Sequence, residues 1–197
     1  MNLAENFALP TLERIPFEVI LHKLITPLAF VETLLISDQQ DIKPKLAKAE
    51  LALRRYRLLL ETFLALKEKD KGSSLSLVFE GIDPSLTISL IKERLSLKQI
   101  TFELTALDNA LTKGELLLLL FLLEEFFWVR CSQGNLVVRV SNSKVFCEFL
   151  GNELIDILPE RDFEGALLFE YLRTMNVNLM AKRNEKHLKL EIIFKKG

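Results

Sequence analysis

Several residue types that mark particular protein classes are scarce in this sequence. It holds two cysteines, two histidines and one tryptophan. Cys131 and Cys147 have neither CxxC spacing nor a neighbouring histidine, which favours two buried thiols in a reducing compartment over a disulfide framework or a metal site. With only two histidines, no Ser-His-Asp arrangement for nucleophilic catalysis is evident.

Glycine, proline and net charge are low as well. Seven glycines and six prolines in 197 residues, with 49% hydrophobic residues, argue against disorder. The net charge of −1 predicts no general affinity for nucleic acid or for an anionic membrane. The apolar run 116–123 stops at Glu124 and Glu125, far short of the ~20 residues that a membrane span needs. Residues 1–15 resemble no signal peptide, so we expect a cytoplasmic protein.

Apolar residues in the first third of the chain recur at steps of three and four, which predicts two long helices. The first begins after Pro16 and runs to about Leu35, with Pro27 inside its pattern. The second runs from about Lys43 to Asp70, after a polar turn at 37–41. An antiparallel helical hairpin of this kind cannot bury both of its apolar faces alone. We therefore expect two copies of the chain to pair as a four-helix bundle.

The pattern changes at Gly72-Ser73-Ser74, where we place a domain boundary. Residues 1–72 then form the hairpin, and residues 73–197 form an α+β domain in which alternating apolar segments predict strands. Thr112 and Glu115 form a capping box at the start of one helix. The predicted strands are 75–79, 99–105, 135–141, 144–150, 177–181 and 187–195, and the predicted helices are 83–97, 112–129 and 164–176. Their order predicts an α/β sandwich, a sheet with helices on one face.

One stretch of the first helix is distinctive: His22-Lys23-Leu24-Ile25-Thr26-Pro27-Leu28. It resembles the phospho-accepting histidine box of sensor histidine kinases, which reads His, an acid, Leu, a basic residue, Thr or Asn, Pro, Leu. The positions that match are His22, Leu24, Thr26, Pro27 and Leu28. The order of elements after the hairpin also resembles the ATP-binding domain of these kinases, although only the box matches in residue detail. The resemblance implies that His22 accepts a phosphoryl group.

Three elements of the kinase ATP site are missing. The asparagine positions of the helix 112–129 hold Phe121 and Glu125, and an unpaired carboxylate at Glu125 would repel a triphosphate. The stretch Glu148–Glu153, placed after the predicted hairpin, lacks the glycine motif that binds adenine. The glycine-rich phosphate loop is reduced to Gly165. We therefore expect no ATP binding, no autophosphorylation and no cofactor of the protein's own.

A kinase-like hairpin joined to a degenerate ATP-binding-like domain is similar to the dimeric histidine phosphotransferases of phosphorelays, of the ChpT and sporulation types. The resemblance implies a homodimer that shuttles a phosphoryl group between receiver-domain aspartates through His22. Its partners would be response-regulator receiver domains, which carry the magnesium, and a hybrid histidine kinase, with the C-terminal domain as a docking wall for receivers. The alternative is a non-catalytic, kinase-like protein that docks a histidine kinase or a response regulator and blocks it. A kinase with an unusual nucleotide site is a third interpretation.

The neighbours of His22 suggest how it would work. A neutral imidazole offers a nucleophilic nitrogen near neutral pH, and the P–N bond of phosphohistidine is labile, so transfer can run in both directions. Glu18, one helical turn earlier, is a candidate to orient the ring. Thr26 could bond the phosphoryl group or, as the commoner default, its own backbone at i−4. Lys23 replaces the acid of the box and could screen the phosphoryl group, and Ile25 replaces the basic residue and implies a more apolar docking surface.

Other interpretations of these residues are structural. His22 could be an ordinary surface histidine, because short motifs also occur by chance. His187 precedes an alternating strand and is expected to point into solvent. Phe126 and Phe127 are expected in the core rather than in a stacking platform. Asp162 and other acidic residues lie in predicted loops without metal-ligand spacing.

Overall fold

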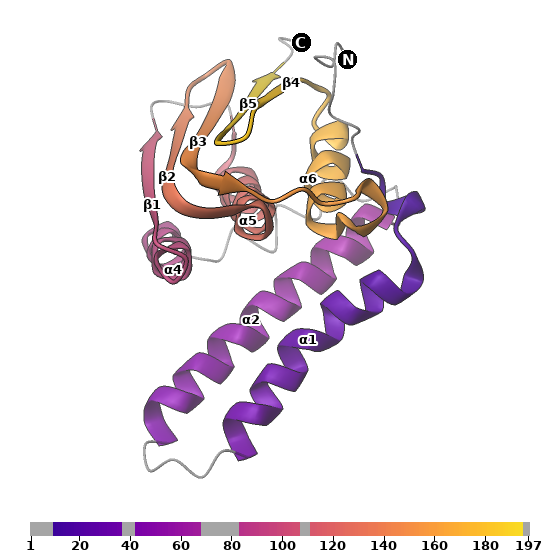
Figure 1. The fold of residues 1–197 in the computed structure, drawn as a ribbon, viewed down its shortest axis with the longest axis vertical. Coiled ribbons are helices and arrows are strands. Elements are labelled where there is room, and N and C mark those ends of the chain that lie inside the picture. The colour runs from indigo at the N-terminus through magenta and orange to yellow at the C-terminus, as the bar shows by residue number, and fades with distance from the viewer. Residues whose placement is uncertain (1–9, 37–41, 68–82, 107–110, 195–197) are drawn as a thin grey trace.

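The structure, a computed structural model, describes residues 10–36, 42–67, 83–106 and 111–194. Two long helices, α1 and α2, project from a layered part that combines a five-stranded sheet with helices α4, α5 and α6 (Figure 1). The elements in chain order are η1 (Leu12–Arg14), α1 (Phe17–Ile36), α2 (Ile42–Lys67), α4 (Pro84–Ser96), β1 (Ile100–Ala106), α5 (Lys113–Arg130), β2 (Cys131–Val140), β3 (Lys144–Leu154), η2 (Pro159–Arg161), α6 (Phe163–Thr174), β4 (Val177–Arg183) and β5 (His187–Phe194).

Helices α1 and α2 lie side by side and run in opposite directions (Figure 1). α1 begins directly after Pro16, whose carbonyl accepts hydrogen bonds from the N–H groups of Val19 and Ile20. The helix continues without a break through Pro27. Ile20 and Val31 are buried along its inner side. The pairing of two copies into a bundle stays a prediction.

The sheet has the strand order β1-β2-β3-β5-β4, with β1 and β2 parallel and all other neighbours antiparallel. Alternate side chains of the central strands are buried, namely Leu136, Val138, Val140, Val145, Cys147, Phe149, Leu188, Leu190 and Ile192. Helices α4, α5 and α6 lie on one side of the sheet (Figure 1), which confirms the predicted α+β architecture. The predicted strand 75–79 and the predicted domain boundary lie outside the described residues.

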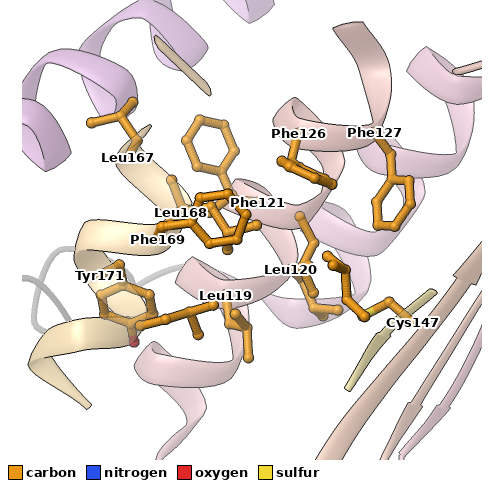
Figure 2. Close-up of a cluster of buried hydrophobic side chains, with 14 of the residues drawn as sticks. Leu119, Leu120, Phe121, Phe126, Phe127, Cys147, Leu167, Leu168, Phe169 and Tyr171 are labelled. Atoms are coloured by element: carbon orange, nitrogen blue, oxygen red, sulfur yellow. The ribbon is translucent and has the colours of Figure 1, made fainter. Parts of the chain in front are cut away.

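Helix α5 is buried along most of its length because it lies between the sheet and α6 (Figure 2). The ring of Phe126 meets that of Phe169 on α6 edge-on, with 5.7 Å between the centroids. The ring of Phe127 lies 6.4 Å from that of Phe149 on β3. Phe126 and Phe127 therefore belong to the core, as predicted. The capping box of Thr112 and Glu115 is also present at the start of α5.

The hydrophobic core continues from the α/β part into the helical pair. Ile15, Ile20, Phe63 and Leu66 belong to the same buried cluster as the inner residues of α5 and α6. The rings of Phe63 on α2 and Phe163 on α6 lie 5.9 Å apart. The two parts of the chain thus share one core, and this packing sets the position of α1 relative to the sheet.

Strands β2 and β3 extend beyond the predicted hairpin. Gly134 and Gly151 are direct partners in their ladder. The ring of Phe149 packs against both glycines, and a Cβ on Gly151 would come within 2.3 Å of it. Because glycines interrupt the alternation of apolar residues, the predicted strand began too late in β2 and ended too early in β3. The stretch 148–153, which was expected to follow the hairpin, lies inside β3.

Candidate functional site

His22 lies in the second turn of α1, and its side chain is exposed. The hydroxyl of Thr26, one turn further on, donates a 2.7 Å hydrogen bond to the backbone carbonyl of His22. This is the i−4 bond that was expected as the default for Thr26. Glu18, one turn earlier, is exposed. Its role in orienting the ring stays a prediction.

The side chain of Lys23 points away from His22. Its ammonium group lies 2.6 Å from a carboxylate oxygen of Glu164 in the first turn of α6. Adjacent helix positions diverge by about 100°, because a turn takes 3.6 residues. His22 therefore faces solvent while Lys23 faces the C-terminal part. The expectation that Lys23 screens a phosphoryl group on His22 is wrong for this structure, since Glu164 engages its ammonium.

An exposed apolar strip runs beside His22 on α1. It consists of residues that are 39–69% exposed: Phe17, Leu21, Ile25 and Leu28. Leucines of α2 are exposed as well, at Leu46, Leu53 and Leu64. Apolar side chains that gather on one surface mark an interaction site more often than scattered ones do. Ile25, which stands where the histidine box has a basic residue, belongs to this strip.

The acidic pair on α5 is buried and ion-paired. Arg55 of α2 places Nη2 2.6 Å from Glu124 Oε2 and 2.5 Å from Glu125 Oε1. Arg94 of α4 places Nη1 2.9 Å from an oxygen of each glutamate. We call these four residues the Arg–Glu cluster. The prediction of an unpaired carboxylate at Glu125 is wrong, because the fold brings an arginine from each of two other helices to α5.

The two carboxyl groups of the Arg–Glu cluster are shifted in opposite directions. Burial raises the pKa of Glu124, and the attraction of Arg55 and Arg94 only partly offsets this effect. Burial acts in the same sense on Glu125, but the two arginines outweigh it and hold its pKa below the usual range. Burial lowers the pKa of Arg55, and the neighbouring Glu125 and Glu124 more than reverse this, so it is raised. The charges are thus buried as mutually dependent groups.

The other positions of the kinase ATP elements are also engaged within the chain. Phe121 is 2% exposed and lies under the guanidinium of Arg55, 5.3 Å from the ring centroid. Gly165 lies in the first turn of α6, where its N–H donates a 2.9 Å hydrogen bond to the carboxylate of Asp162. Asp162 caps this helix and also pairs with the buried Arg130. Gly165 lies within the predicted helix 164–176, and Asp162, which was predicted in a loop, lies directly before α6 as its N-cap.

The remaining candidate residues have structural roles. His187 Nε2 lies 2.9 Å from Glu148 Oε1 on the neighbouring strand, so this histidine has a carboxylate partner rather than only solvent. Cys131 and Cys147 are free and buried, as predicted. Burial raises the pKa of Cys131 to about 12 and raises that of Cys147 as well, which makes both thiols poor nucleophiles. Within the described ranges, no group of three His, Cys, Asp or Glu side chains is arranged to hold a metal ion.

None of the helices in the described part of the chain is long and apolar enough to cross a lipid bilayer.

The sequence alone did not identify the cationic partners of the buried carboxylates. One signal was available: Glu124 and Glu125 follow a long apolar run and precede Phe126 and Phe127. Such a pair is buried with its helix, and buried carboxylates need cations. The pattern does not say which of the many arginines supplies them, because Arg55 is distant from the pair in the sequence.

No protein-family model and no curated protein matches this sequence. Solved structures do match. A bacterial phosphotransferase superposes with a TM-score of 0.53 at 12% sequence identity, over 89% of this chain and 92% of that chain. The histidine kinase AdeS of Acinetobacter baumannii superposes with a TM-score of 0.50 at 14% identity, over 88% of this chain and 97% of that chain. At these identities the likeness shows the fold, and this chain has a histidine-kinase-like fold.

Proposed function

We propose that the protein is a phosphorelay histidine phosphotransferase of the ChpT or sporulation type. His22 takes a phosphoryl group from the aspartyl phosphate of one receiver domain and passes it to the aspartate of another. The observation that carries the proposal is the exposure of His22 within a histidine-box sequence on α1. The fold shared with a bacterial phosphotransferase supports it.

The transfer step makes modest demands on this chain. A neutral ring nitrogen of His22 attacks phosphorus, the P–O bond to the receiver aspartate breaks as the P–N bond forms, and the aspartate leaves as a carboxylate. The imidazole releases its other ring proton to solvent, and the reverse step delivers the group to the second receiver. Phosphoryl transfer depends mainly on in-line positioning and charge neutralisation. The receiver supplies its aspartate and magnesium, and this chain supplies an accessible imidazole.

Transfer without ATP is supported by the positions of the former ATP elements. The carboxylate of Glu125 is held by two arginines, the side chain of Phe121 is buried, and Gly165 is part of a helix start. These residues therefore contribute to packing between helices instead of offering ligands to magnesium or phosphate. We infer that the phosphoryl group comes from a partner and that the protein has no cofactor of its own.

A homodimer through the helical pair is part of the proposal. The exposed Leu46 and Leu53 of α2 are at heptad spacing, and Leu60 and Leu64 continue the same side of the helix. Together with the apolar strip of α1, they form a surface that a second copy would cover. Receiver domains would then approach His22 from the side that remains open.

A transfer experiment with two histidine variants tests the proposal. Wild-type protein is incubated with a receiver domain that carries radiolabelled aspartyl phosphate, and label is followed on both proteins with magnesium present. We expect label on the wild type and on His187→Ala, and none on His22→Ala. Because His187 is the only other histidine of the chain, it is the matched control.

Two outcomes would contradict the proposal. Label that persists on His22→Ala excludes His22 as the acceptor. Wild-type protein that binds receivers or a histidine kinase but takes no label from any of them is a non-catalytic regulator.

A separate measurement tests for a nucleotide site. A thermal shift with ATP and magnesium would indicate a retained nucleotide site, since a ligand at 100 times its Kd adds about 2.7 kcal/mol of stability.

A further inference from the structure

The Arg–Glu cluster connects the helical pair to the C-terminal part of the chain. Arg55 comes from α2, Arg94 from α4, and the two glutamates from the middle of α5. The side chains of Glu124 and Glu125 are 1% and 5% exposed, and that of Arg55 is 16% exposed. The cluster therefore lies inside the contact between the two parts.

The geometry of the cluster allows one relative position of these helices. A single nitrogen of Arg55, Nη2, lies within 2.6 Å of Glu124 and 2.5 Å of Glu125. A single nitrogen of Arg94, Nη1, contacts the same two carboxylates from α4. A shift of α2 by one helical turn along α5 would remove Arg55 from both glutamates at once.

Burial makes such a shift costly. Leaving a buried carboxylate without its cation is strongly destabilising, whereas the intact pair adds little beyond what apolar residues of the same size would give. The surrounding contacts are leucine and phenylalanine side chains, which tolerate repacking when volume is conserved. The apolar core thus favours association of the two parts, and the Arg–Glu cluster selects their register.

A second ion pair also joins the helical pair to the C-terminal part, through α1 instead of α2. Lys23 reaches Glu164 on α6, and its neighbour His22 points to solvent. Two connections at separate places on the helical pair, one through α2 and one through α1, prevent rotation as well as sliding of the C-terminal part.

We propose that the Arg–Glu cluster holds the C-terminal part in one position beside His22, and that Arg55 is a positioning residue for phosphotransfer. The role of Arg55 in phosphotransfer rests on the proposed function, in which a receiver contacts both α1 and the C-terminal part. Arg55 contacts Glu124, Glu125 and Phe121 and acts only through the position of the C-terminal part. It keeps the docking surface at a constant distance from the phosphoryl-accepting ring.

Whether the cluster fixes the position of the C-terminal part can be tested without any phosphorylation, by measuring distances between the helical pair and the C-terminal part. Spin labels are attached to cysteines introduced at the exposed positions Glu32 on α1 and Lys182 on β4. The buried native cysteines do not compete for the label. Labelled chains are diluted with excess unlabelled wild type, so that a dimer carries one labelled copy and only distances within a chain are read.

The matched control for Arg55→Met is Arg54→Met. Arg54 is adjacent on α2 and is exposed, and its one ion pair within the described residues is with Glu50 of its own helix, at 2.6 Å. We expect one narrow distance distribution for wild type and Arg54→Met and a clearly broader one for Arg55→Met. Arg55→Lys should be intermediate, because one ammonium can take the place of the nitrogen that bridges the two glutamates. Glu125→Gln, which keeps the shape and removes one charge, should broaden the distribution even if Arg55→Met does not fold.

Transfer kinetics test whether Arg55 positions the C-terminal part for phosphotransfer. For Arg55→Met and Glu125→Gln we expect the receiver concentration at half-maximal rate to rise roughly tenfold, the change that weaker docking produces, with the rate at saturation nearly unchanged. A merely structural role would lower the maximal rate in proportion to the unfolded fraction and leave half-saturation alone.

Each half has its own contradicting result. Distributions for Arg55→Met and Glu125→Gln as narrow as that of Arg54→Met would overturn the cluster as the element that sets the position. Broadened distributions with unchanged half-saturation would overturn Arg55 as a positioning residue. Absence of label on wild type would contradict the proposed function alone, since the distances are measured without it.

Discussion

His22 and Lys23 are adjacent in the sequence but belong to different surfaces of the molecule. Because adjacent positions of a helix point in different directions, His22 is exposed to solvent and Lys23 points towards α6. There it pairs with Glu164, whose side chain is 8% exposed. At the scale of single residues, this stretch of α1 is therefore divided between an exposed candidate acceptor, His22, and an ion-paired residue, Lys23. The substitution of an acid by lysine in this box has a structural explanation in Glu164.

The anchor can be tested by substitution. Lys23→Met leaves the buried carboxylate of Glu164 without a cation, so we expect the free energy of unfolding to fall by about 1–2 kcal/mol in urea titrations. The value is at the low end for a buried pair because Lys23 is 33% exposed and partly screened by water. The double variant Lys23→Met/Glu164→Gln should recover part of the loss.

The exposed pair of Arg54 and Glu50 provides the comparison for this measurement. Arg54→Met should cost about 0.5 kcal/mol or less, as exposed pairs within one helix usually do. Equal effects of Lys23→Met and Arg54→Met would show that the contact with Glu164 does not hold the helical pair in solution.

At the scale of elements, α5 is the helix that departs most from its expected role. The sequence resemblance aligns it with the helix that holds magnesium in the kinases, whereas here its glutamates meet Arg55 of α2 and Arg94 of α4. At these positions α5 is buried, and both carboxylates are engaged by arginines of other helices. The two acids serve as the polar part of a contact between helices.

This role predicts that the contribution of Glu125 on α5 to the free energy of unfolding depends on pH. The pKa of Glu125 is depressed by the arginines, so its contribution to stability is present above about pH 4.3, the value for an unfolded carboxyl, and is lost as pH falls through the lower folded value. Glu125→Gln lacks this contribution at every pH. The unfolding free energy of wild type should therefore exceed that of the variant at neutral pH, and the difference should narrow under acid conditions.

Urea midpoints of both proteins across this pH range provide the measurement. Glu124 is present in both proteins, but the charge of Glu125 is one of the causes that raise its pKa, so Glu125→Gln should bring the pKa of Glu124 down. Glu50→Gln, at the exposed pair with Arg54, is the control and should differ little from wild type at any pH. A difference for Glu125→Gln that stays constant with pH would contradict an ionised, arginine-bound Glu125.

At the scale of the whole molecule, one core joins the helical pair to the α/β part, while an apolar surface of the pair stays exposed. Ile20 and Phe63 face inward to the shared core, whereas Leu21 and Leu53 are 42% exposed on the outer side. A chain that uses one side of each helix internally and leaves leucines on the other side is suited to self-association.

Dimerisation through this surface can be tested by introducing a charged side chain into it. Leu53→Glu should shift the protein from dimer to monomer in analytical ultracentrifugation at concentrations where wild type is dimeric, because a carboxylate cannot be buried there without a partner. Leu97→Glu is the control, since Leu97 is 77% exposed in the turn before β1 and lies outside the helical pair. A monomeric wild type, or equal dimerisation of both variants, would contradict a dimer through α1 and α2.

Much of the fold follows from local patterns. The periodicity from Phe17 to Ile36, the capping box at Thr112 and the alternation of Leu188, Leu190 and Ile192 each reflect a short-range rule, and the corresponding elements are present. The histidine box likewise identifies His22 from neighbouring residues alone, and helical geometry explains its exposure. Where glycines interrupted the alternation, the predicted strand began too late, at Gly134 in β2, or ended too early, at Gly151 in β3.

The sequence by itself therefore determined most of the elements that the structure describes, their order, and His22 as the candidate acceptor. Only the tertiary structure decided what the charged residues do: Lys23 anchors α1, Glu124 and Glu125 bind arginines from α2 and α4, and Asp162 starts a helix. The physical reason is the distance along the sequence over which each interaction acts. Periodicity and capping act within a few residues, whereas a buried charge needs a partner that the chain brings close only by folding.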